Sequence, residues 1–146
     1  MHLLISEVLD LFEKTKGKEE KLAILKKYES PVLRAIMRIN FDPSVQMALP
    51  DGEPPFKKEP DRPIGEQLTK LESEYRRFYI WLDPKVQLTK FKKEQLFVEM
   101  LEGLHLSEAE VICLAKDKKL HTKFKTLKED LVREAYPSTL PPKSNA

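Results

Sequence analysis

Two helical patterns with a basic segment between them place the strongest constraint on how this 146-residue chain folds. Ser107 with Glu110, and Thr126 with Glu129, both fit the S/T-x-x-E capping box, in which a hydroxyl and a carboxylate bond free amides at a helix start. Apolar residues recur at helical spacing after each box, and Pro137 ends the second pattern. The sequence therefore predicts two short amphipathic helices joined by an elbow.

The elbow, residues 114–128, concentrates the positive charge of the chain. It holds six lysines and one aspartate, a net charge of +5, whereas the whole chain carries only +2. Phosphate groups bind where cationic side chains, backbone amides and helix amino termini converge, so the elbow is a candidate phosphate-binding site. The alternative is that the lysines only solubilise a surface turn, and charge alone favours neither interpretation.

Composition indicates one all-helical domain. Of the residues, 40% are apolar, 34% are charged and only four are glycine. A chain of this length buries roughly two thirds of the surface that its unfolded form exposes, which is enough for a core. No apolar run approaches the ~20 residues of a membrane span, and the amino terminus lacks the features of a signal peptide. The single cysteine, Cys113, excludes an intramolecular disulfide and favours a reducing compartment.

Further helices are predicted from apolar periodicity and from cap residues. Ser30 before Pro31 combines a cap hydroxyl with proline at the first helical position, and Thr89 is expected to cap another helix. The predicted helices cover residues 4–17, 18–28, 31–40, 64–82 and 89–104. The pattern D-P-x-V-Q occurs at 42–46 and at 83–87; two Asp-Pro helix starts explain it, and internal duplication is the alternative. The first copy is expected to open one or two helical turns.

Residues 50–63 contain five of the eleven prolines and therefore cannot form a helix or a central strand. This segment is longer than most connections, so it is either a binding loop or a strap that wraps the domain. We expect one helical domain over residues 1–137 and a flexible tail over 138–146.

The chain carries no motif of a known catalytic site, metal site or phosphate-binding loop. His2, His105 and His121 are far apart in the sequence, so we expect no metal and no cofactor. Cys113 lies on an apolar helix face, where packing is a better explanation than nucleophilic chemistry. Trp81 and its aromatic neighbours are expected in the core, with a platform for base stacking as the alternative.

Short motifs from about residue 3 to residue 141 follow the order of one known family. Residues 21–25 match a K-x-x-I-L element, and residues 32–41 match an LL-x-x-V-x-R-L-x-Y element that places Arg38 on its arginine. Residues 86–104 and 108–141 match two later elements, with Lys116-Asp117 on an Arg-Asp pair and Tyr136-Pro137 on a Trp-Pro pair. In this order the chain resembles the amino-terminal region of ATP-dependent DNA ligases of the T-even phage type. It also resembles small uncharacterised proteins of T-even-like myoviruses.

The resemblance implies an all-helical DNA-binding domain that contacts duplex DNA phosphates from the minor-groove side, near a nick. It also implies a bacteriophage protein that acts in DNA replication or repair in the cytoplasm of the bacterial host. The positions carried over from the family are Arg38, Lys90, Lys116 and His121. Charge alone adds Lys118, Lys119, Lys123 and Lys125 as DNA-binding candidates.

The chain departs from the ligases in two respects. It has no K-x-D-G adenylation motif, so we expect no ligase activity and no catalytic residue. Lys90 and His121 replace two turn glycines of the family, which removes a close approach of backbone to phosphate. The first hypothesis is a non-catalytic, sequence-independent duplex-DNA-binding accessory protein. The alternative is a helical adaptor or regulator that binds a phage or host protein through residues 50–63 or 75–81.

Overall fold

The computed structural model describes residues 3–140, and all regular structure in that range is helical. The α-helices are α1 (Ile5–Lys14), α2 (Lys18–Lys27), α3 (Pro31–Phe41), α4 (Leu71–Glu74), α5 (Tyr79–Leu82), α6 (Lys90–Gly103), α7 (Leu106–Lys116) and α8 (Glu129–Ala135). Two 3-10 turns, η1 (Tyr75–Arg77) and η2 (Leu120–Thr122), accompany them. The predicted all-helical fold is confirmed. Within the described range, no helix combines the length and the apolar composition needed to cross a bilayer.

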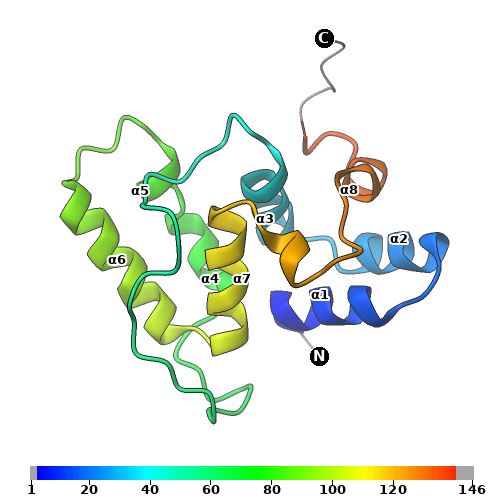
Figure 1. The fold of residues 1–146 in the computed structure, drawn as a ribbon, viewed down its shortest axis with the longest axis horizontal. Coiled ribbons are helices and arrows are strands. Elements are labelled where there is room, and N and C mark those ends of the chain that lie inside the picture. The colour runs from blue at the N-terminus through cyan, green and yellow to red at the C-terminus, as the bar shows by residue number, and fades with distance from the viewer. Residues whose placement is uncertain (1–2, 141–146) are drawn as a thin grey trace.

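Helix α7 forms the centre of the molecule. Figure 1 shows it between α6 on one side and α1 on the other, and α1, α3 and α6 all pack against it. Ala109, Ile112 and Ala115 are fully buried, and seven of the eleven residues of α7 are buried. The segment that the sequence identified as amphipathic is therefore the central helix on which α1, α3 and α6 pack.

The helix starts that depend on local chemistry are confirmed. The Ser30 hydroxyl accepts the Leu33 N–H at 3.2 Å, and Pro31 is the first residue of α3. The Thr89 hydroxyl accepts the Lys92 N–H at 3.1 Å and caps α6. Each of these caps satisfies an amide that has no partner inside its own helix.

Neither predicted capping box forms. The cap of α7 is His105, whose Nδ1 accepts the Ser107 N–H at 3.1 Å. Helix α8 begins only at Glu129, because the Thr126 N–H donates to the Glu13 carboxylate and the Thr126 hydroxyl oxygen accepts from the Lys21 ammonium at 2.8 Å. Both predicted starts were therefore wrong by two residues: the neighbouring His105 caps α7, and residues distant in the sequence occupy the cap groups of Thr126.

The two D-P-x-V-Q segments end helices instead of starting them. Asp42 follows α3, and its Oδ1 accepts the Ser44 N–H at 2.9 Å and the Ser44 hydroxyl at 2.7 Å. Asp83 follows α5, and its Oδ1 accepts the Lys85 N–H at 2.9 Å. Both segments therefore form the same Asx-type turn after a helix, and the expected helical turns after Asp42 are absent.

The helix predicted for residues 64–82 forms only from Leu71 onwards, and it is divided into α4, η1 and α5. The preceding residues are held elsewhere, because Leu68 and Thr69 both donate their N–H groups to the Gly103 carbonyl at 3.0 Å. Leu68, which periodicity placed on a buried face, is 84% exposed. A Cβ at Gly103 would lie 3.1 Å from the Thr69 side chain, so the glycine permits this close approach.

The predicted tail begins on the surface of the domain. Ser138 is exposed, but the Leu140 side chain is buried. Residues 141–146, the rest of that predicted tail, and residues 1 and 2, with His2, lie outside the described residues.

Candidate functional site

Lys116, predicted to contact DNA, is an internal anchor. Its side chain is only 2% exposed, and Nζ donates to the carbonyls of Pro50 and Gly52 at 2.8 and 3.0 Å. The Asp117 carboxylate lies 2.6 Å from the same Nζ. Lys116 therefore cannot reach a phosphate from this position. Its spacing gives the reason: it follows Ile112 by four residues on the same buried side of α7.

Lys118 is also turned inward. Its Nζ donates to the carbonyl of Ile39 in the last turn of α3 and to the carbonyls of Asp42 and Val45 in the segment after it. Burial lowers the pKa of Lys118, and the nearby Asp42 carboxylate opposes that shift. The backbone of Lys118 has φ 60°, the left-handed conformation that closes α7 in a Schellman-type turn. Lys118 is thus a structural link between α7 and α3.

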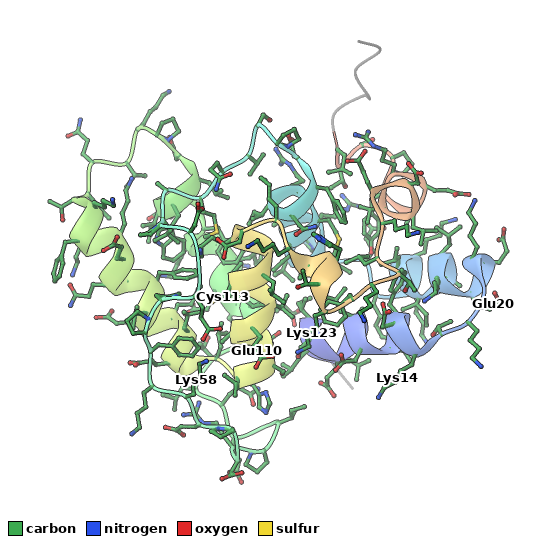
Figure 2. All side chains as sticks on the ribbon, viewed as in Figure 1. Lys14, Glu20, Lys58, Glu110, Cys113 and Lys123 are labelled. Atoms are coloured by element: carbon green, nitrogen blue, oxygen red, sulfur yellow. The ribbon has the colours of Figure 1, made fainter. Side chains whose placement is uncertain are left out.

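The rest of the elbow is partly neutralised. Lys123 forms an ion pair with Glu110 at 2.8 Å, and Figure 2 shows the two side chains together in the middle of the molecule. At the far end of the elbow, the Lys21 ammonium donates to the Thr126 hydroxyl at 2.8 Å. The predicted DNA-binding residues that stay exposed on this segment without such a partner are Lys119, His121 and Lys125.

Arg38 and Lys90 do not complete a single cationic face. Arg38 is exposed on α3 and, like Lys118, lies close enough to Asp42 to lower the pKa of that carboxyl, after the larger effect of the Ser44 hydroxyl. Lys90 is the first residue of α6, and Figure 1 places that end of α6 at the edge of the molecule, away from η2. The structure therefore brings Arg38 near the elbow but not Lys90.

Trp81 and Cys113 both lie in the core. Trp81 packs edge-on against Phe97, with ring centroids 5.5 Å apart, and its Nε1 donates to the Lys93 carbonyl at 2.9 Å. This burial opposes a base-stacking role for Trp81. Burial raises the pKa of the Cys113 thiol to about 12, so the nucleophilic thiolate is scarce at neutral pH. Within residues 3–140, no three His, Cys, Asp or Glu side chains are grouped to hold a metal ion.

The proline-rich segment is a strap that passes between α6 and α7 (Figure 1). One end is fixed by the Lys116 ammonium and by the Gly52 N–H, which donates to Asp117 at 3.0 Å. The middle is fixed by the Lys57 N–H, which donates to Glu102 at 2.8 Å, and the far end by the Arg62 carbonyl, which lies 2.9 Å from His105 Nε2. Proline has no N–H to satisfy, so a proline-rich strap can cross the surface between two anchors without secondary structure.

Between these anchors the strap and α6 form the walls of an apolar groove of about 530 Å³, which we call the strap groove. Residues 49–55 form one wall. The other wall comes from α6 side chains at positions that face away from the core, namely Phe91, Glu94, Gln95, Val98 and Glu99. Phe97 and the buried Lys116 complete the lining.

Helix α6 thus has apolar residues on two faces. Phe97, Met100 and Leu101 face the core, whereas Phe91 is 74% exposed at the groove. The sequence contains one sign of this, because Phe91 does not share the spacing of the core positions. The groove itself could not be predicted, since its two walls are about forty residues apart in the sequence.

Comparisons with curated proteins and with solved structures give no match. The resemblance to the ligase domain therefore stays a prediction. Residues 8–122 match a protein family, and this range includes both walls of the strap groove and the anchors Lys116 and Asp117. Because the match covers most of the chain, the protein belongs to this family, which is described as a family of unknown function (DUF6433).

Proposed function

We propose that this protein is a non-catalytic helical adaptor that binds a protein partner in the strap groove. The observation that carries the proposal is the groove in which Phe91 and Val98 of α6 lie beside an anchored strap. An exposed apolar surface with a polar rim is typical of an interaction site.

The groove is held ready for a partner. Hydrogen bonds to Asp117 and Glu102 fix the strap on both sides of it. A partner therefore does not have to order the strap when it binds, which removes one entropic cost of association.

A site-specific crosslinking experiment tests the proposal. A photo-crosslinking residue replaces Gln95 in the groove, or Ala23 on the exposed side of α2 as a control. We expect a protein adduct from the Gln95 position that survives nuclease treatment and disappears when Val98→Arg places a charge in the groove. An adduct of equal yield from Ala23, or one that Val98→Arg leaves intact, would contradict the proposal.

Duplex DNA binding is the second candidate function, and one observation favours it. Lys119, His121 and Lys125 remain exposed on one short segment that includes η2. Lys119→Ala with Lys125→Ala should weaken DNA binding and reduce the salt dependence of log K by roughly 0.9 for each phosphate contact that is lost. DNA affinity that is unchanged in this variant would exclude the elbow as the DNA site.

A further inference from the structure

The charges along the strap groove indicate what kind of partner it accepts. Asp51 lies on the strap wall, and Glu94 and Glu99 lie on the α6 wall. Among the described residues, no ion pair engages any of these three carboxylates. Glu53, on the same strap wall, is instead paired with Lys58.

The one cation that lines the groove does not balance these acids. The Lys116 ammonium is buried and already holds two strap carbonyls and the Asp117 carboxylate. Its charge is therefore directed at the strap and at Asp117 rather than at an occupant. Lys90, one turn before Glu94, forms no ion pair with it and lies at the end of α6.

We infer that the occupant of the strap groove is a basic segment of a partner protein, with a large apolar side chain flanked by lysine or arginine. The apolar side chain packs on Phe91 and Val98, and the flanking cations meet Asp51, Glu94 and Glu99. Complementary charge at the rim of an apolar site speeds association and excludes acidic competitors. This inference depends on the proposed function, because it names the partner chemistry of the same groove.

A selection from a library of random dodecapeptides tests the inference on the full-length protein. Wild-type protein is the bait, and folded Val98→Arg protein is the counter-selection bait. We expect the enriched peptides to carry net positive charge and at least one Phe, Trp, Leu or Met. Val98→Arg should weaken their binding by at least ~10-fold, as for a central interface residue.

Charge-neutral variants separate the inference from the proposed function. Glu94→Gln with Glu99→Gln should weaken the same peptides roughly 3- to 10-fold, since exposed ion pairs are individually weak. Glu19→Gln with Glu20→Gln on α2 changes the net charge equally, away from the groove, and should have no effect.

The outcomes are distinct. Enriched peptides that are neutral or acidic, and that bind the Gln variants normally but not Val98→Arg, would overturn the charge inference and leave the groove as a binding site. Peptides that bind wild type and Val98→Arg equally would overturn both the charge inference and the proposed function of the groove. If the wild-type protein self-associates in sedimentation and Val98→Arg does not, the occupant is a second copy of this chain, and the inference is wrong.

Discussion

The elbow and the strap meet at Lys116 and Asp117, and they differ in how their charges are used. The elbow has the strongest charge in the sequence, yet Lys116 and Lys118 hold backbone carbonyls inside the molecule. The strap has little charge bias, yet it forms one wall of the strap groove and carries Asp51, a carboxylate that no described residue pairs with. A run of charged residues therefore identifies a binding surface only if its side chains extend into solvent rather than bond groups inside the protein.

This comparison predicts the largest effect at Lys116. Lys116→Ala leaves two strap carbonyls without a donor and Asp117 without its cation. We expect the free energy of unfolding, measured with urea, to fall by about 3–5 kcal/mol, as when one partner of a buried pair is removed.

Lys119→Ala is the matched control, because Lys119 is an exposed lysine of the same elbow. Its free energy of unfolding should change by less than ~0.5 kcal/mol. Equal stabilities of the two variants would mean that Lys116 does not anchor the strap, and the contrast between the elbow and the strap would fail.

Substitution of Lys118 is expected to cause the next largest loss of stability. Two substitutions separate the contribution of its ammonium group from that of its backbone conformation. Lys118→Ala removes the ammonium that binds three carbonyls but keeps a side chain at φ 60°. The free energy of unfolding should fall by about 1.5–3 kcal/mol, the range for hydrogen bonds to charged groups.

Lys118→Gly loses the same hydrogen bonds but relieves the left-handed backbone, so it should be about 1 kcal/mol more stable than Lys118→Ala. Thermal and urea unfolding of both variants measure the difference. A glycine variant no more stable than the alanine variant would show that the backbone conformation carries no strain.

The strap side of the comparison is tested by Glu102. Glu102→Ala removes the acceptor of the Lys57 N–H at an exposed site, so global stability should fall by no more than ~1 kcal/mol. Hydrogen exchange of the Lys57 amide should nevertheless become faster, because its local bond is lost. Glu99→Ala, one turn away without a bond to the strap, is the control and should leave that exchange rate unchanged.

The parts of the fold that follow from local chemistry were predictable, and the parts set by distant partners were not. Ser30 and Thr89 cap their helices as expected, since each hydroxyl bonds an amide three residues away. Thr126 failed as a cap because Glu13, at a sequence separation of 113, takes its N–H, and the Lys21 ammonium, at a separation of 105, occupies its hydroxyl oxygen. Lys116 bonds Pro50 at a separation of 66, so no local pattern specified the anchored strap.

Charged residues on a buried helix face were the signal that the sequence did offer. Glu108 and Lys116 both share the buried side of Ile112, four residues before it and four residues after it. Each satisfies backbone groups of another segment: Glu108 accepts from Ile5 and Leu71, and Lys116 donates to Pro50 and Gly52. A charge at a core position of a helix thus indicates a connection inside the protein, although Lys116 was predicted from the sequence to bind DNA.

The smallest predicted effect is a pH dependence of the free energy of unfolding that comes from Glu108. Its carboxylate accepts the N–H groups of Ile5 and Leu71 at 2.9 and 3.0 Å. Burial raises the pKa of Glu108 above its ordinary value of 4.5, and the two N–H bonds oppose that shift. The folded protein therefore keeps a proton at a pH where the unfolded chain has released it, and this group lowers the free energy of unfolding as pH rises through that window.

Glu108→Gln removes this titration, so its stability deficit relative to wild type should be largest near pH 4 and should shrink as pH rises to about 7. Asp42→Asn is the contrasting variant, since the Ser44 hydroxyl lowers the pKa of Asp42 below 3.8. The Asp42 carboxylate contributes stability above pH 3.8 that is lost as pH falls through its lowered pKa, so the deficit of Asp42→Asn should grow with rising pH and then level off. Urea unfolding from pH 3 to 7 measures both. If the two stability deficits change in the same direction with pH, the backbone N–H groups outweigh the effect of burial on the pKa of Glu108. The ionised carboxylate of Glu108 then stabilises the fold, as the Lys116 ammonium does at the other end of α7.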